Sequence, residues 1–339
     1  MKKYFLKRLL YMVLVFLIVS LLMYFLYNLI PNDPARAELE GLKTTLKPEE
    51  YEIMYQRLRE QMGLNDPLIV RYARWMGFLP EKATGVFKGL LQGYLGYSSY
   101  FKQDVIQILP ERMANTIFIN VFVTILSLAI TIPLGIVCAV RKRGKLDNTV
   151  QVLTIVGYSI PIYIIALLFI WLFGVTLGWF PVMGIKTPGS NYTGMKAFLD
   201  QLYYLTLPIL VMTFASLGGM TRYVRTAMID ALGMDYIRTA RAKGLREKVV
   251  IYSHAWRNAL MPVITVIISW FLGIFSGSVI VENTFALNGM GNLYITGLTN
   301  HDYELVLAVQ MFYTAVSLIG ALIMDLSYGL VDPRVRVDK

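Results

Sequence analysis

The sequence predicts an all-α, polytopic membrane protein with six transmembrane helices. Of its 339 residues, 56% are hydrophobic and only 16% are charged, whereas about a quarter of the residues in a typical soluble domain are charged. Six apolar stretches reach the length of about 20 residues with which a helix crosses a bilayer. These stretches are residues 9–30, 114–140, 150–173, 202–220, 259–281 and 305–330.

The positions of Lys and Arg predict the orientation, because basic residues concentrate on the cytoplasmic side of a membrane. With the N-terminus in the cytoplasm, six spans leave residues 1–8, 141–147, 222–257 and the C-terminal tail inside. These segments hold nineteen of the 32 basic residues, whereas the outer segment 282–304 holds none. We therefore expect both termini in the cytoplasm. The formal net charge of +10 then reflects topology, not binding of nucleic acid.

The first span is expected to be retained in the mature protein. Its basic start and apolar core imitate a signal peptide, but the apolar run continues for about 22 residues, beyond the roughly 7–15 of a removable signal. It ends in LIPNDP, without a small-residue cleavage site. The single cysteine, Cys138, lies in the predicted second span, which excludes an intramolecular disulfide.

The long connection between the first two spans, residues 31–113, is expected to lie outside the cytoplasm. Residues 47–64 (KPEEYEIMYQRLREQMGL) predict an amphipathic helix that stops at Gly63. Its apolar residues at helical spacing are Tyr51, Met54, Leu58 and Met62. A second short helix is expected after the Asp-Pro pair at 66–67, and GYLGYSSYF is typical of a membrane interface. Two interpretations stay open: a lid over the outer mouth, or a docking or gating surface for an external partner.

Three predicted spans carry polar or small residues on one helical face. The stripes are Asn120, Thr124, Ser127 and Thr131; Thr265, Ser269, Gly273 and Ser276; and Gln310, Thr314, Ser317, Ala321 and Asp325. Such residues let membrane helices pack closely, which explains any single stripe. Three stripes in one chain also suggest a polar translocation path. Asn120 and Gln310 are its best candidates, because an amide that faces lipid is costly.

Sequence motifs of catalysis are missing. There is no G-x-x-x-x-G-K-[ST] phosphate loop, no G-x-S-x-G elbow and no H-E-x-x-H metal motif. His254 and His301 fall on opposite sides of the membrane in the predicted topology, so they cannot share a metal site. We therefore expect no catalytic residues and no metal site, and the sequence argues against an enzyme. Uphill transport would take its energy from a partner or an ion gradient.

The basic segment between the fourth and fifth predicted spans has the features of a short docked helix. Asp235 is expected to cap a helix that begins at Tyr236, and Gly244 to end it one residue after Lys243. Two turns are too few for stability in water, so such a helix must dock on something. Its small residues, Thr239, Ala240 and Ala242, allow another surface to approach the helix closely. Its basic residues, Arg238, Arg241 and Lys243, surround the helix with positive charge. The alternative is a positive-inside loop whose sequence hardly matters.

The sequence after Gly244, REKVVIYSHAWRNALMP, predicts a second helix. It is expected to be amphipathic and to lie at the membrane surface, with Trp256 as an interface anchor. Pro262 is expected near the start of the fifth span.

The stretch YIRTARAKGL…SHAWRNALMPVIT resembles the cytoplasmic EAA loop of binding-protein-dependent ABC importer permeases, in its dipeptide/oligopeptide variant. Gly244 matches the loop glycine and Ala240 the second alanine, whereas Arg238 and Thr239 replace the generic Glu and first Ala. The resemblance implies a coupling helix that inserts into a cleft of a separate ATPase subunit. Its residues are Asp235, Tyr236, Arg238, Thr239, Ala240, Arg241, Ala242, Lys243 and Gly244.

Further motifs extend the resemblance along most of the chain. They include SIPIYIIALLFIWLFGVTLGWFPVMG, ENTFALNGMGNL and the tail YGLVDPRVR; Tyr94 and Asn288 depart from the usual Asp and Pro. The division that follows is a first span at 1–30, an outer segment at 31–113, a five-helix permease core at 114–330 and a cytoplasmic tail at 331–339. The core contains the coupling loop 226–262.

The resemblance implies a permease subunit of an ATP-driven importer of di- or oligopeptides in a bacterial or archaeal cytoplasmic membrane. Its expected partners are a second homologous permease that forms a heterodimer, two cytoplasmic ATP-binding subunits and an extracytoplasmic substrate-binding (lipo)protein, with no nucleic acid. ATP and Mg would be bound by the ATPases, and no cofactor by this chain. Charge reversal at Arg241 or bulk at Ala240 is then expected to uncouple ATP hydrolysis from uptake. The alternative is an ATP-independent channel or secondary carrier for small polar solutes.

Overall fold

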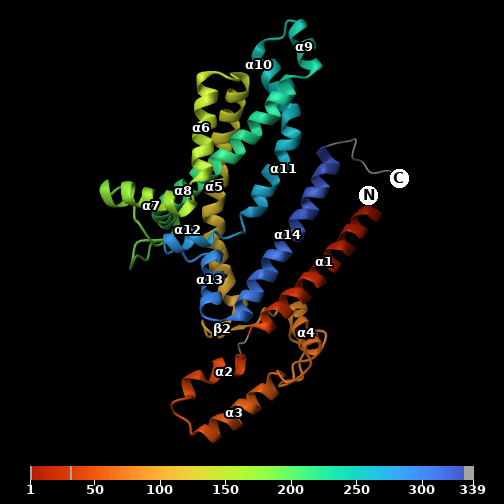
Figure 1. Ribbon diagram of the computed structural model, residues 1–339, viewed down its shortest axis with the longest axis vertical. Helices are drawn as coiled ribbons and strands as arrows, with labels where there is room; N and C mark the ends of the chain where they lie inside the picture. Colours follow the sequence, from red (N-terminus) through yellow and green to blue (C-terminus); the bar gives the residue numbers. More distant parts are fainter. Residues whose placement is uncertain (1, 31–32, 332–339) are drawn as a thin grey trace. The chain divides into compact units, whose positions relative to one another are not determined.

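The apolar stretches of the sequence form long helices in a computed structural model, which describes residues 2–30 and 33–331 (Figure 1). The chain divides into two compact units. Unit 1 comprises the described residues of Met1–Arg112 and Leu293–Leu318, and unit 2 those of Met113–Asn292 and Ile319–Lys339. The predicted boundaries at residues 30, 113 and 330 divide the chain by membrane crossing and stay predictions. From residue 332 on, the predicted tail lies outside the described residues.

Unit 1 holds the first helix, the segment that follows it and the beginning of the last helix. Its elements are α1 (Lys2–Leu29), α2 (Pro34–Leu39), η1 (Glu40–Leu42), α3 (Pro48–Gln61), α4 (Leu68–Met76), η2 (Leu90–Gln92), β1 (Tyr97–Ser98) and β2 (Gln103–Asp104). Three further helices contribute residues to both units: α5 (Val105–Val140), α13 (Met290–Thr299) and α14 (Tyr303–Val331).

The two helices predicted between residues 47 and 76 are present as α3 and α4. Gly63 follows α3 with a φ of 67°, the left-handed conformation that glycine adopts after a helix. The buried face of α3 differs from the prediction: Tyr55 is buried, and Tyr51 and Leu58 pack against its cluster, whereas Met62 is exposed. The Tyr55 hydroxyl donates a hydrogen bond to Asp33, so a long-range polar contact decides which side of α3 faces inward.

Aromatic packing joins α4 to α1. The rings of Tyr72 and Trp75 lie 5.6 and 5.3 Å from the ring of Tyr24, and the Tyr72 hydroxyl lies 2.8 Å from Ser20 Oγ. These edge-on and tilted aromatic contacts bury large apolar surfaces and contribute beyond their area.

A short hairpin is tied to the start of α14 within unit 1. β1 pairs with β2 in antiparallel register. The Ser98 hydroxyl and the Tyr100 N–H donate hydrogen bonds to the Asp302 carboxylate, at 2.5 and 3.2 Å, and the Tyr97 N–H donates one to Glu304 at 3.0 Å. The segment predicted as a glycine- and tyrosine-rich membrane interface is therefore a hairpin with a fixed position.

Unit 2 contains most of the long helices. Its remaining elements are α6 (Lys145–Ser159), α7 (Ile162–Phe169), the π-helical η3 (Ile170–Thr176), α8 (Gly194–Leu232), α9 (Asp235–Ala242), α10 (Glu247–Val249), the π-helical η4 (Val250–Trp256), α11 (Arg257–Gly273) and α12 (Val279–Thr284). Figure 1 shows α6 beside α5 and α8, with α9 and α10 beyond one end of α8. A Cβ atom on Gly135 of α5 would lie only 2.7 Å from the Val224 Cβ of α8, so glycine allows this close approach.

The third predicted span, 150–173, is not one straight helix, and its crossing of the membrane stays a prediction. α6 and the helix formed by α7 and η3 meet at a bend of 100°. Pro161 lacks the N–H that would continue the helix, and Ile160 before it is extended, with φ −82° and ψ 124°. A residue before proline avoids the helical conformation for steric reasons. The proline in IPI therefore breaks the helix within an unbroken apolar run.

Five helices among the described residues are long and apolar enough to cross a membrane. They are Phe5–Leu29, Val105–Val140, Gly194–Leu232, Glu247–Gly273 and Tyr303–Asp325, and the bent pair makes a sixth if it counts as one span. At 1.5 Å per residue, the 39 residues of α8 extend about 58 Å, well beyond the ~30 Å apolar core of a bilayer. α8 is therefore too long to lie entirely within that core.

Candidate functional site

The short helix predicted at 235–244 is present as α9, but its N-cap residue and its last residue differ from the prediction. α9 begins at Asp235, so Asp235 is not the cap; the N-cap residue is Met234, and no side-chain hydrogen bond caps the helix among the described residues. The helix ends at Ala242, with Lys243 as C-cap. Gly244 has a φ of 75°, which confirms the predicted glycine stop.

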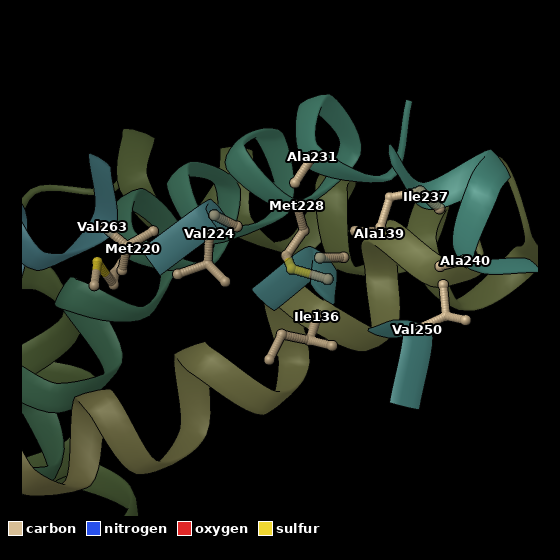
Figure 2. Packing of buried hydrophobic residues seen from close by; sticks show 12 residues of the cluster. Ile136, Ala139, Met220, Val224, Met228, Ala231, Ile237, Ala240, Val250 and Val263 are labelled. Carbon is tan, nitrogen blue, oxygen red and sulfur yellow. The ribbon is translucent and has the colours of Figure 1, made fainter. Parts of the chain in front are cut away.

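One side of α9 is docked on its own chain. Ile237 and Ala240 are buried in a cluster with Ala139 of α5, residues of α8 and Val250 of η4. Figure 2 shows Ile237 beside Ala139 and Ala240 above Val250. The expectation that Ala240 leaves room for another protein is therefore wrong. Ala240 is small because it packs against the start of the helix that leads into α11.

The other side of α9 faces outward. Its exposed residues are Asp235, Tyr236, Arg238, Thr239, Arg241, Ala242 and Lys243. The Arg238 side chain is 80% exposed and lies 3.5 Å from Asp235, one turn away, which is a weak surface contact. Partial burial raises the pKa of the Tyr236 phenol. This face, here called the α9 outer face, combines positive charge with the small side chains of Thr239 and Ala242.

Arg241 is engaged within the chain. Its guanidinium donates two hydrogen bonds to Glu247, at 3.2 and 2.7 Å. The bidentate geometry links the end of α9 to the start of α10 across the Gly244 turn. Arg238 and Lys243 are therefore better candidates than Arg241 for contact with a partner.

The second helix predicted after Gly244 is not a separate surface helix. Residues Glu247–Gly273 form one helix, in which α10, η4 and α11 follow each other without a break. Pro262 lies inside α11, and Trp256 packs against the cluster under α9. The helix that receives α9 therefore runs directly into the fifth candidate span.

A buried ion pair, which the sequence did not indicate, joins α6 to α8 in the same unit. Asp147 is 1% exposed and accepts hydrogen bonds from Arg225 Nε and Nη2 at 2.6 and 2.7 Å, and from the Arg143 N–H at 2.9 Å. Both charged residues lie in segments that looked like ordinary basic loops or helix ends. Their separation of 78 residues left no local pattern that could pair them.

The polar stripe of α5 is buried. Asn120, Thr124, Ser127 and Thr131 are all less than 9% exposed. The Asn120 amide donates to the carbonyls of Ile274 and Ser276 at 3.0 and 2.9 Å, the Ser127 hydroxyl lies 2.6 Å from Ser216 Oγ of α8, and Thr131 donates to the Ser127 carbonyl. These contacts use the stripe for helix packing. A role in translocation stays a prediction.

The other two stripes are less buried. Thr265 is half-buried, and Ser269 and Ser276 are exposed on unit 2; Ser269 donates to the Thr265 carbonyl at 3.0 Å. In unit 1, Gln310 and Thr314 are half-buried and Ser317 is exposed. Among these stripe residues, one hydrogen bond joins two different stripes of unit 2: the Asn120 amide donates to the Ser276 carbonyl. The remaining residues stay separate candidates.

A buried carboxylate organises the segment ENTFALNGMGNL. Glu282 is 3% exposed and accepts hydrogen bonds from the Thr116 hydroxyl at 3.2 Å and the Asn292 N–H at 2.7 Å. A Cβ on Gly289 would lie 2.5 Å from the carboxyl carbon of Glu282, so the glycines of this segment leave room for the carboxylate. An acidic residue directly after an apolar run and before closely spaced glycines is the signal that could have identified it.

Fold and site together define a multi-span helical membrane protein that presents a short helix beyond one end of a long helix. The comparisons with known proteins are consistent with this class. Residues 131–337 match the family described as the binding-protein-dependent transport system inner membrane component. Residues 1–120 match the N-terminal region of such membrane components.

Several relatives match over nearly the full length. The chain is 33% identical over 337 residues to the oligopeptide transport system permease protein AppB of Bacillus subtilis (strain 168), which covers 99% of this chain and 100% of that protein. It is 33% identical over 338 residues to a putative peptide permease protein of Brucella suis biovar 1, with 99% and 100% covered. It is also 31% identical over 334 residues to a probable peptide ABC transporter permease protein of Sinorhizobium fredii, with 98% and 99% covered.

The chain belongs to the family of binding-protein-dependent transport system inner membrane components, as its motifs predicted. It is a multi-pass membrane protein of that family.

Proposed function

We propose that this chain is one of two membrane subunits of an ATP-driven, binding-protein-dependent importer of di- and oligopeptides. Family membership and the peptide permeases among its full-length relatives support the transport role and the substrate class. The observation that carries the coupling role is the division of α9 into a docked side and an exposed, basic side. A helix of only eight residues with one free face is suited to a partner surface.

The proposed assembly places the chain in the membrane with six spans and both termini in the cytoplasm. A second, homologous permease completes a heterodimer, two ATPases bind ATP and Mg on the cytoplasmic side, and an extracytoplasmic (lipo)protein delivers the peptide. The concentration of basic residues in segments 1–8, 141–147 and 222–257 supports this orientation.

The proposed mechanism passes motion from the ATPases through α9. ATP binding closes the ATPases and displaces the α9 outer face. Because Ile237 and Ala240 are packed against α5, α8 and η4, that displacement moves the ends of three long helices together. The Asp147–Arg225 pair adds α6 to the same moving body. A shift at one end of packed helices can then change access at the other, provided that the helices have two stable arrangements.

The test replaces residues of the α9 outer face. Arg238→Glu reverses a charge that is 80% exposed, and Ala242→Trp adds bulk at an exposed position, so neither change enters the buried cluster. We expect both variants to reach the membrane at normal levels and to lose peptide import by about tenfold or more, since interface hot spots cost at least about 2 kcal/mol. Lys186→Glu, a charge reversal at an exposed residue between η3 and α8 that lies outside the cluster under α9, is the matched control and should import normally.

The outcome separates the rival functions. Normal import by both α9 variants would show that α9 does not couple the chain to an ATPase. Import into proteoliposomes that hold this chain without any ATPase would instead establish a channel or secondary carrier.

A further inference from the structure

Unit 1 contains a cavity of about 580 Å³ that the transport mechanism above does not use. The end of α1, α3 and α4, the segment 81–99 and the start of α14 supply its walls. Its volume falls within the roughly 300–1,000 Å³ typical of small-molecule sites. We call it the outer cavity, because its walls include the segment between the first two predicted spans.

Two ion pairs lie in the walls of the cavity. Arg59 pairs with Asp33, and Arg74 pairs with Asp66 at 2.8 Å. The hydrogen bond from Arg74 holds the pKa of the Asp66 carboxyl below its usual range. These charges are neutralised within the wall, so they do not select a ligand.

The Glu304 carboxylate can accept further hydrogen bonds. Its side chain lies in the cavity wall and is exposed. Among the described residues it accepts one hydrogen bond, from the Tyr97 N–H at 3.0 Å, whereas a carboxylate can accept about four. Within residues 2–30 and 33–331, no Lys or Arg nitrogen lies within salt-bridge distance of it. Glu38 lines the same cavity and adds negative charge.

The aromatic wall around Glu304 suits a cation. Tyr27, Tyr94, Tyr97 and Tyr303 line the cavity together with Trp75. The Lys88 ammonium, which also lines the cavity, lies 3.9 Å from the centre of the Tyr94 ring. It occupies that face, so the rings of Tyr27, Tyr97, Tyr303 and Trp75 are the candidates for contact with a ligand. A carboxylate beside aromatic faces is the arrangement that proteins use to bind ammonium groups.

Arg71 supplies the opposite charge in the same cavity. Its Nη2 donates to Asn28 Oδ1 at 2.6 Å, which uses one of the five N–H donors of a guanidinium. No carboxylate of the described residues lies within salt-bridge distance of Arg71. Its remaining donors match a ligand carboxylate.

We propose that the outer cavity binds a short peptide with free termini, its ammonium group at Glu304 and its carboxylate at Arg71. This inference rests on the proposed import of peptides and adds to it a peptide site on the permease itself. The cavity recognises the charges at the two termini of the peptide. The peptide side chains lie against aromatic rings, so the site accepts many peptide sequences.

The test measures binding of tri-alanine to the purified full-length chain in nanodiscs by calorimetry. We expect Glu304→Gln to weaken binding by about tenfold to a hundredfold, the range of a hydrogen bond between charged groups. Glutamine keeps an acceptor for the Tyr97 N–H, so the wall is preserved. N-acetyl-tri-alanine should bind the wild-type chain and Glu304→Gln equally weakly.

Arg71→Gln should weaken the binding of tri-alanine to the same degree. The variant should then bind tri-alanine no more tightly than it binds tri-alanine amide, which lacks the terminal carboxylate. Matched controls are Glu60→Gln and Arg57→Gln, exposed residues of α3 outside the cavity wall, which should bind tri-alanine like the wild type. The acetylated and amidated peptides test the same contacts on the unmutated chain, so the result does not depend on the folding of a variant.

Two results would overturn the inference. One is equal affinity of tri-alanine for the wild type and Glu304→Gln. The other is that the wild-type chain does not bind tri-alanine although its complex imports peptides with ATP. That result would leave the proposed function intact. Loss of capture of the binding protein by Glu304→Gln, without any tri-alanine binding to the wild type, would assign the cavity to protein docking instead.

Discussion

At the scale of single residues, the Asp147–Arg225 pair makes the clearest prediction about stability. Asp147 is buried, and its carboxylate accepts three hydrogen bonds. Asp147→Asn leaves the Arg225 guanidinium, which is 19% exposed, without its counter-charge. Breaking a buried pair costs about 3–5 kcal/mol. We expect a clear decrease in the unfolding temperature of the chain in nanodiscs, measured by calorimetry.

The matched control for that prediction removes both charges. Because an unpaired buried charge causes most of the loss, Asp147→Asn combined with Arg225→Met should regain part of the stability. An unfolding temperature of Asp147→Asn equal to that of the wild type would show that the pair does not hold α6 to α8.

At the scale of secondary structure, the presence of the helices was predicted, whereas their bends and the sides on which they pack were not. The apolar length of α5 and the spacing within α3 indicated helices because these signals are local. The bend at Pro161 had a local signal too, the proline in IPI, but the apolar run on both sides concealed it. The docked side of α9 had a local signal in Ile237, the large aliphatic residue of the helix, which lies three positions before Ala240. The small size of Thr239 and Ala240 did not distinguish these two residues, whereas the packing of Ala240 near Val250 does.

Polar sites showed the same limit. Asn120 was identified because an amide in an apolar helix is conspicuous, yet its partners, the carbonyls of Ile274 and Ser276, are more than 150 residues away. The Tyr55–Asp33 contact and the walls of the outer cavity likewise join distant segments. The sequence therefore supplied candidates one by one, and the structure determined which candidates meet.

The α2–α3 element also makes a prediction about pH. Burial raises the pKa of Asp33, but the hydrogen bonds from Tyr55 and the Ala35 N–H and the charge of Arg59 outweigh it, so the pKa is lower than usual. A carboxylate with a lowered folded pKa stabilises the fold above its unfolded pKa of about 3.9 and loses that contribution as the pH falls through the folded value. We expect hydrogen exchange of α3, corrected for intrinsic rates, to stay protected at pH 5 and to lose protection below about pH 4.

Asp33→Asn is the control for this pH dependence. It removes the titrating group, so α3 should be less protected at pH 7 and should change little between pH 5 and pH 3.5 if Asp33 causes the effect. Loss of protection in the wild type already above pH 5 would contradict the assignment to Asp33.

At the scale of the whole molecule, the bent pair of α6 with α7 and η3 determines the topology. If the pair crosses the membrane, there are six spans, and Lys142 and Lys186 lie on opposite sides. If the pair enters and leaves on one side, there are five spans, and every later segment changes sides. The eight basic residues between 222 and 257 would then lie on the outside with α9, against the positive-inside rule.

Cysteine labelling in intact cells tests this prediction directly. Cys138 is buried, so it should contribute little background. We expect cysteines at the exposed positions Glu50 and Lys186 to react with a membrane-impermeant maleimide, and cysteines at Lys142 and Lys243 to react only after permeabilisation. Labelling of Lys186→Cys only after permeabilisation, together with labelling of Lys243→Cys in intact cells, would establish five spans. Such a result would also place α9 where no cytoplasmic ATPase could reach it, and the coupling proposal would fail with the topology.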